Sequence, residues 1–170
     1  MHRLRFLWIV CRGIFGQRRI AIDISILKMR VSVFDVDVTR MFSWRYCGLM
    51  DLARVDLMVR QGFFMKVLRQ GYAPLVASQF ITYKKSLRLF QKYEIHSRFA
   101  AWDDQWAYLE HRFVVNGETI ACGYVKGLFR SARRKLPIPE MFALGGDYTS
   151  SPPFPNWTKY LDELHLSSIT

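Results

Sequence analysis

Apolar side chains between residues 44 and 60 point in nearly every direction when the segment is drawn as a helix. A helix on a protein surface has one apolar stripe and one polar stripe. Five charges are instead scattered over this otherwise apolar cylinder: Arg45, Asp51, Arg54, Asp56 and Arg60. The segment is also too short and too polar for a membrane span, which needs about 20 mainly apolar residues. The pattern predicts a helix that is buried on several sides.

A strand is predicted just before this helix. Over residues 28–33, basic or hydroxyl side chains alternate with apolar ones, which is typical of a half-buried strand. Residues 20–26 are also rich in β-branched side chains and are expected to form either a strand or a docking arm. The chain then reaches an acidic pair, Asp35 and Asp37, which ends the strand and precedes the helix.

The ends of the central helix are marked by residues that favour helix termini. Thr39 or Ser43 is expected to cap its start, since a hydroxyl accepts a hydrogen bond from the free N–H groups of the first turn. Gly62 is expected just after its end, where glycine adopts a left-handed backbone at little cost. A second, short helix is predicted over residues 63–69.

Four long segments in the second half of the chain have strand character. They cover residues 75–87, 92–102, 106–115 and 118–129. Asp103–Asp104 and Asn116–Gly117 form short turns between them, and Asn-Gly is a strong signal for a two-residue hairpin. Antiparallel strands of this length usually curl. The pattern predicts an α+β fold in which a long, curled antiparallel sheet wraps around the central helix.

The chain is expected to contain one full-sized core with a different segment on each side. We assign residues 1–27 to a basic amphipathic N-terminal arm, residues 28–135 to the folded domain, and residues 136–170 to a Pro-rich C-terminal tail with a short helix around Trp157. A hydrophobic share of 51% argues against disorder, which needs low hydrophobicity and high charge.

The net charge of +11 is concentrated at two places. Residues 1–30 carry seven Lys or Arg against a single Asp, and residues 119–139 carry five basic residues and no acid. This distribution argues against nucleic-acid binding, which favours a basic helix or sheet face with exposed aromatic residues. Residues 1–19 are expected to lie on an anionic membrane surface, to remain a solvated arm or to dock as a helix.

Cysteine and histidine spacing gives no sign of a metal site. Cys11, Cys47 and Cys122 are odd in number and lack a metal-binding spacing, so neither a disulfide framework nor a metal is expected. We interpret His96 and His111 as structural residues of the predicted strands. A cytoplasmic location is expected, with peripheral contact at the inner membrane surface as the alternative that residues 1–19 leave open. No cofactor is expected.

Several motifs in the same order resemble one family. The runs DVDVTRM and WRYCGLMDLAR, followed by KKSLRLFQKYEI and AWDDQWAYLEHRF, are similar to the thioesterase superfamily of 4-hydroxybenzoyl-CoA thioesterase-like hotdog proteins, nearest to the thioesterase superfamily member 6 branch. The resemblance covers roughly residues 28–130. It implies the hotdog fold, a homodimer or dimer of dimers with active sites at the subunit interface, and hydrolysis of acyl-CoA thioesters.

The resemblance also implies roles for acidic residues. Asp37, just before the helix, would act as base or nucleophile while an N–H group at the helix start polarises the thioester carbonyl. The free N–H groups and dipole of a helix N-terminus favour a developing oxyanion, and a carboxylate can activate water. Asp51 is the second catalytic candidate, with an ion pair to Arg54 or Arg45 as its alternative role. Asp35 is interpreted as structural.

The loop before the helix departs from the family pattern. Relatives of this branch read D-x-D-x-x-x-H-M-N-N-x-x-Y, whereas this chain is one residue shorter, lacks the His and places Phe42 and Ser43 where the two Asn would be. Ser43 is expected to replace one of the lost hydrogen bonds at the reacting carbonyl. Phe42, Trp44 and Tyr46 are expected to line the substrate site.

Two functions follow from these observations. The first is an acyl-CoA thioesterase, in which Lys84, Lys85 and Arg88 either contact the phosphates of CoA or face solvent. The second is a non-catalytic acyl-CoA or lipid-binding hotdog protein, since the His and both Asn are missing. A hotdog dehydratase is disfavoured, because that chemistry pairs a His with a carboxylate and no His lies within residues 35–60.

Overall fold

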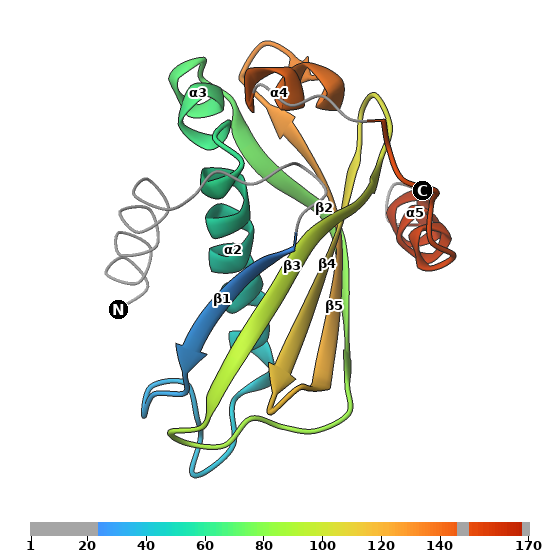
Figure 1. The fold of residues 1–170 in the computed structure, drawn as a ribbon. Coiled ribbons are helices and arrows are strands. Elements are labelled where there is room, and N and C mark those ends of the chain that lie inside the picture. Colours follow the sequence, from blue (N-terminus) through green and yellow to red (C-terminus); the bar gives the residue numbers. More distant parts are fainter. Residues whose placement is uncertain (1–23, 146–149, 168–170) are drawn as a thin grey trace.

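A computed structural model describes residues 24–145 and 150–167, and within them an antiparallel sheet curls around helix α2 (Ser43–Arg60) (Figure 1). The strands lie in the order β1 (Ser25–Arg30), β3 (Lys92–Trp102), β4 (Ala107–Val115), β5 (Glu118–Arg130) and β2 (Ala73–Tyr83). The short β6 (Lys135–Leu136) pairs with the end of β5. The predicted α+β class, with a curled sheet around a central helix, is confirmed.

Helix α2 is buried on most of its sides, as its apolar cylinder predicts. Its apolar buried residues are Tyr46, Leu49, Met50, Leu52, Ala53, Leu57, Met58 and Val59. Met50 of the helix approaches β5 closely at Gly123, where an added Cβ would clash with the Met50 sulfur. Met50 therefore fills the space that a side chain at position 123 would need, and a larger residue there would displace it.

Helix α2 begins without a capping side chain. Phe42 occupies the N-cap position and forms no side-chain cap hydrogen bond. The predicted caps Thr39 and Ser43 are therefore wrong, because Ser43 is already the first helical residue and Thr39 lies in the preceding turn. Gly62 follows the end of the helix with a φ of 79°, as predicted.

Strand β1 is shifted by three residues toward the N-terminus relative to the predicted range 28–33. The reason is its partner. β1 pairs with β3 from Ser25 opposite Ser97 to Arg30 opposite Lys92, and β3 begins at Lys92. Beyond Arg30 no β3 residue remains for the chain to pair with. The strand therefore ends at Arg30, although the alternating sequence pattern continues to residue 33.

Strand β2 ends at Tyr83, four residues before the predicted end at residue 87. Leu87 nevertheless belongs to the core: it is fully buried, and its N–H donates to the Tyr46 hydroxyl at 3.0 Å. An apolar residue in a buried loop thus has the same sequence signature as a strand residue. The Asn116–Gly117 hairpin is confirmed, with φ values of 49° and 80°.

Helices α3 (Phe64–Arg69) and α4 (Ile138–Gly145) lie at one end of the sheet (Figure 1). The sequence predicts α3 but not α4, because prolines on both sides of Ile138 suggest an irregular tail. Proline is tolerated in the first turn of a helix, where its missing N–H would have no partner. Phe142 of α4 packs edge-on against Phe63 and Phe99, so this part of the predicted tail belongs to the core.

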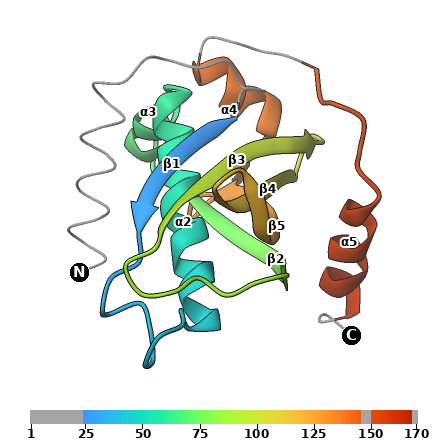
Figure 2. The same cartoon turned by 60° about the horizontal axis from the view of Figure 1, so that its bottom comes forward.

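The predicted C-terminal helix is confirmed as α5 (Trp157–Ser167), which lies on the other face of the sheet from α2 (Figure 2). Trp157 packs against Tyr124 of β5, with ring centroids 4.6 Å apart. Asp162 accepts hydrogen bonds from the buried Lys126 ammonium and the Tyr108 hydroxyl, both at 2.7 Å. These contacts fix α5 on the outer face of the sheet.

The N-terminal arm is not among the described residues. The predicted membrane contact of residues 1–19, and Cys11 with it, therefore lie outside the part of the chain that the structure describes. Over residues 24–145 and 150–167, none of the helices has the length and apolar character needed to cross a membrane. Cys47 and Cys122 are free thiols.

A buried ion pair joins the loop before α2 to the helix itself. Asp35 has no exposed side-chain surface, and its Oδ1 accepts a hydrogen bond from Arg45 Nε at 3.0 Å and contacts Nη2 of the same guanidinium. Its Oδ2 accepts hydrogen bonds from the N–H and hydroxyl of Ser32, at 3.0 and 2.9 Å. Asp35 is therefore structural, as expected.

We expect Asp35→Ala to lower the free energy of unfolding by about 3–5 kcal/mol, because it leaves the Arg45 guanidinium buried without its carboxylate. Urea unfolding followed by circular dichroism measures this loss. Asp37→Ala, two residues away on an exposed turn, is the matched control and should cause a much smaller loss. Equal losses in the two variants would contradict the structural role of Asp35.

Candidate active site

The start of α2 lies beside the loop that follows β2. The Met41 N–H donates to the Leu87 carbonyl at 2.8 Å, and the Leu89 N–H donates to the Thr39 carbonyl at 2.9 Å. The Tyr83 hydroxyl donates to the carbonyl of Ser43 at 3.3 Å. These bonds bring the predicted site residues of the first helical turn close to the basic segment that begins at residue 84.

Asp37 lies in an exposed turn just before this point. Its carboxylate accepts hydrogen bonds from the backbone N–H groups of Val38 and Arg40, and its own N–H donates to the Arg40 carbonyl. These N–H groups, that of Val38 first, lower the pKa of the Asp37 carboxyl. The carboxylate is thus ionised at neutral pH, and its present hydrogen bonds stabilise the turn.

The aromatic residues of the α2 start are divided between surface and core. The rings of Phe42 and Trp44 stack with centroids 5.9 Å apart, and Trp44 is 59% exposed. Tyr46 is buried, and its ring packs edge-on against Tyr83 and Phe113. Phe42 and Trp44 can therefore touch a ligand at the surface, whereas Tyr46 supports the site from beneath.

Basic residues gather around the loop that follows β2. Lys84 and Lys85 contact the Glu118 carboxylate at 2.8 and 2.6 Å, and these contacts lower the Glu118 pKa to about 2. Lys85 also lines a surface cavity of about 510 Å³, together with Arg40 and Arg88. Both arginines are exposed. This cavity presents three cations and one carboxylate to a ligand.

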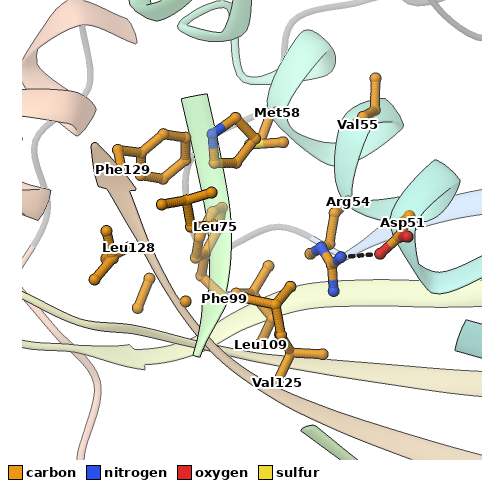
Figure 3. A pocket seen from close by; sticks show the side chains of 14 residues that line it. Asp51, Arg54, Val55, Met58, Leu75, Phe99, Leu109, Val125, Leu128 and Phe129 are labelled. Atoms are coloured by element: carbon orange, nitrogen blue, oxygen red, sulfur yellow. Dashed lines mark hydrogen bonds and ion pairs between the residues drawn. The ribbon is translucent and has the colours of Figure 1, made fainter. Parts of the chain in front are cut away.

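A second, apolar cavity of about 300 Å³ lies between α2 and the sheet (Figure 3). Helix α2 provides one wall and strands β2 to β5 provide the others, through the residues Val55, Met58, Leu75, Phe99, Leu109 and Val125. Its two charged lining residues are Asp51 and Arg54, which form an ion pair in which Arg54 Nη2 contacts Asp51 Oδ1. Asp51 is 63% exposed, whereas only 12% of the Arg54 side chain is.

The ion pair expected for Asp51 is therefore formed with Arg54, because Arg45 is held by Asp35. Burial lowers the pKa of the Arg54 guanidinium, and the Asp51 carboxylate opposes this shift. Within the part of the chain that the structure describes, Arg54 Nη1 is buried without a hydrogen-bond partner.

His111 lies in the core. Its side chain is fully buried on β4, and its Nδ1 lies 2.8 Å from the Ser97 hydroxyl. Burial, and then the charge of Arg54, lowers the pKa of His111 well below its ordinary value, so the imidazole is neutral at pH 7. His96 instead lies 2.8 Å from Glu94. Over residues 24–145 and 150–167, no cluster of His, Cys, Asp or Glu is arranged to hold a metal ion.

The structure thus separates the predicted site residues into two groups. Asp37, Ser43 and the basic segment lie around the start of α2, whereas Asp51 lies eight positions after Ser43. At 1.5 Å per residue this is about 12 Å along the helix. Sequence reasoning missed Arg54 as a cavity residue, because only the packing of α2 on the sheet shows where its side chain points.

Comparison with known proteins places the chain in a family. A family model described as the thioesterase-like superfamily matches residues 31–145. The chain belongs to this superfamily. It is 30% identical over 125 residues to Protein THEM6 of Xenopus laevis, and 33% identical over 107 residues to the probable thioesterase YBR096W of Saccharomyces cerevisiae. These matches cover 69% and 61% of this chain and 58% and 46% of those relatives, so the chain spans about half of their length.

A solved structure of a gentisyl-coenzyme A thioesterase has the same fold as this superfamily member. It superimposes with a TM-score of 0.65 at 22% identity, over 71% of this chain and 98% of the other. Sequence identity at this level supports a shared fold alone. The hotdog fold that the sequence motifs imply is confirmed.

We expect the free energy of unfolding to fall as the pH is lowered from 7.5 to 5.5. Below its ordinary pKa of 6.5, His111 takes up a proton in the unfolded chain but not in the buried site of the folded protein. The unfolded state then binds more protons, which costs about 1.4 kcal/mol for each pH unit below 6.5. Urea unfolding across this range measures the slope.

The control for this prediction is His111→Gln, which removes the titrating group and keeps a polar side chain. Its stability should depend less on pH than that of the wild type over the same range. Parallel pH profiles for the two proteins would show that His111 is not the group responsible.

Proposed function

We propose that the protein hydrolyses acyl-CoA thioesters, with the acyl chain held in the cavity between α2 and the sheet. The observation that carries this proposal is the cavity itself, whose walls are apolar and whose edge holds a carboxylate and a guanidinium. Its volume of about 300 Å³ lies at the lower end of the range for small-molecule sites. Membership of the thioesterase-like superfamily supports the same chemistry.

The basic cavity at the start of α2 is proposed to bind the phosphates of CoA. Arginine matches the geometry of a phosphate group with two parallel hydrogen bonds, and lysine provides a point charge. Arg40, Arg88 and Lys85 can supply both kinds of contact. Lys84 and Lys85 would exchange part of their contact with Glu118 for the phosphate. Phe42 and Trp44, both exposed at the start of α2, are proposed to cover the CoA portion of the bound substrate.

We assign the base that activates water to Asp51, because this carboxylate lines the apolar cavity. Arg54 beside it would stabilise the negative charge that develops on the thioester oxygen. The family resemblance implies Asp37 as the alternative base, with the free N–H groups at the start of α2 polarising the carbonyl. Ser43 would then contribute from the first helical turn. The two arrangements lie about 12 Å apart along the helix, so one substrate cannot use both carboxylates at once.

Asp51→Asn should lower kcat by about 100-fold or more, the usual loss when a general base is removed. The measurement is thiol release from a panel of acyl-CoA chain lengths. Asp104→Asn, in the turn between β3 and β4, is the matched control and should retain full activity. Loss of activity in Asp37→Asn, with full activity in Asp51→Asn, would assign the base to the start of the helix instead. If the wild type releases no thiol from any acyl-CoA, the proposed reaction is wrong.

A non-catalytic acyl-CoA carrier is the second candidate. The observation that favours it is the exposed Phe42, which stacks on Trp44 and stands where the family resemblance implies an Asn. Calorimetric titration with a non-hydrolysable acyl-CoA analogue, combined with the thiol-release assay, distinguishes the two functions. Tight binding without turnover would favour the carrier.

The protein is also proposed to form a homodimer through β2. Among the described residues, no strand pairs with the outer side of this edge strand, whose exposed residues include Leu75, Val76 and Tyr83. An apolar edge of this kind favours pairing with a second strand. Because Leu75 and Val76 also line the acyl cavity, such pairing would place the cavity beside the subunit interface.

Sedimentation velocity should show a dimer for the wild type at micromolar concentration. Gln79→Lys, near the middle of β2, should shift the distribution toward monomer, because two symmetry-related lysines would then lie near each other across the paired strands. Lys159→Gln on α5 is a control that leaves the β2 edge unchanged. A wild type that is monomeric at every concentration would overturn this assembly.

A further inference from the structure

The apolar cavity has a charged end that the hydrolysis of a thioester does not fully explain. Arg54 extends from α2 toward the sheet, with Asp51 beside it (Figure 3). Asp51 contacts only Nη2 of the guanidinium, and Nη1 is buried with no hydrogen-bond partner among the described residues. A buried donor without an acceptor is costly, and for a charged group the cost is larger still.

A second unpartnered nitrogen lies in the same layer of the core. Nδ1 of His111 is close to the Ser97 hydroxyl, but Nε2 is buried and has no partner within the described part of the chain. The strand register relates it to Arg54. His111 is opposite Gly123, against which Met50 packs, and Arg54 follows Met50 by one helical turn.

The same register connects these nitrogens to the cavity. Leu109 and Val125, which pair with each other and line the cavity, each lie two residues from the His111–Gly123 pair on β4 and β5. Residues two apart on a strand point to the same face of the sheet. The buried guanidinium is therefore placed between the imidazole and the apolar walls.

We propose that the Arg54 guanidinium anchors the carboxylate of an unesterified, medium-chain fatty acid, whose hydrocarbon chain occupies the apolar cavity. The inference rests on the proposed function in one respect, since it uses the same cavity for the acyl chain and makes the acid product its ligand. Nη1 of Arg54 donates to the carboxylate. In the His111 tautomer whose Nδ1 accepts from the Ser97 hydroxyl, Nε2 carries the hydrogen and provides a second donor near Arg54.

The neighbouring Asp51 limits how tightly such a ligand binds. Its carboxylate repels a second carboxylate held by the same guanidinium, but it is largely exposed and therefore screened by solvent. This arrangement favours an acid that binds measurably and still dissociates, as a reaction product must. Replacing Arg54 should therefore weaken the binding of the acid, whereas replacing Asp51 should strengthen it.

The test is isothermal titration calorimetry of the full chain at pH 8 with three ligands of equal chain length: octanoate, 1-octanol and octylamine. The wild type should bind octanoate roughly 10- to 100-fold more tightly than 1-octanol, the difference expected for hydrogen bonds to a charged group. Octylamine should bind most weakly, because it brings a cation to Arg54. Equal affinity for octanoate and 1-octanol would overturn the proposal without any variant.

Variants distinguish the contribution of the Arg54 guanidinium to binding from that of the apolar cavity. Arg54→Gln should remove the preference for octanoate while 1-octanol still binds, and Arg54→Lys should keep part of it. Asp51→Asn should bind octanoate several-fold more tightly than the wild type. Arg69→Gln, an exposed arginine at the end of α3, is the matched control and should behave as the wild type. A preference that survives in Arg54→Gln would overturn the assignment.

Thiol release measured on the same samples distinguishes this inference from the proposed function. Octanoate preference without acyl-CoA turnover would leave the carboxylate site in place and refute the hydrolase. Turnover with no octanoate preference would refute the carboxylate site and leave the hydrolase in place. Circular dichroism of each variant identifies any that fails to fold, in which case the wild-type ligand series decides.

Discussion

Direct contact between α2 and the sheet is the constraint on which the rest of the structure depends. Gly123 lets Met50 reach the backbone of β5, and this close approach brings the next turn of the helix over the strands. A helix in this position must be apolar on most sides, yet it carries five charges. Those that are buried need partners, which Asp35 supplies for Arg45, and Ser25 and Arg60 for Asp56.

The parts of the fold that local pattern determines could be predicted from the sequence. The buried helix, the long strands and the Asn116–Gly117 hairpin each follow from the spacing of a few neighbouring residues. The errors arose where a distant partner decides the outcome. β1 ends at Arg30 because its partner β3 begins at Lys92. Helix α4 forms despite its prolines, with Phe142 packed against the Phe63 ring.

The candidate site was only partly predictable for the same reason. Composition and motif order identify the acidic and basic residues, but they do not say which of them share a cavity. Asp37 and Asp51 look equivalent as carboxylates near a helix, and only the folded chain shows one on an exposed turn and the other at a cavity edge. The sequence indicates Arg54 only as a possible ion-pair partner of Asp51. The buried, unpartnered Nη1 of Arg54 follows from three-dimensional packing, which the sequence alone does not show.

Helix α5 restricts how the proposed dimers could pack against one another. By packing against β5 through Trp157 and against β2 through the bond from Ser78 to the Leu161 carbonyl, it covers that half of the outer sheet surface. Two dimers cannot stack sheet against sheet over an area that a helix already occupies. Within residues 24–145 and 150–167, the β1–β3 half of the outer face carries no such helix, so a tetramer built from the proposed dimer would have to form there or on the side of α2.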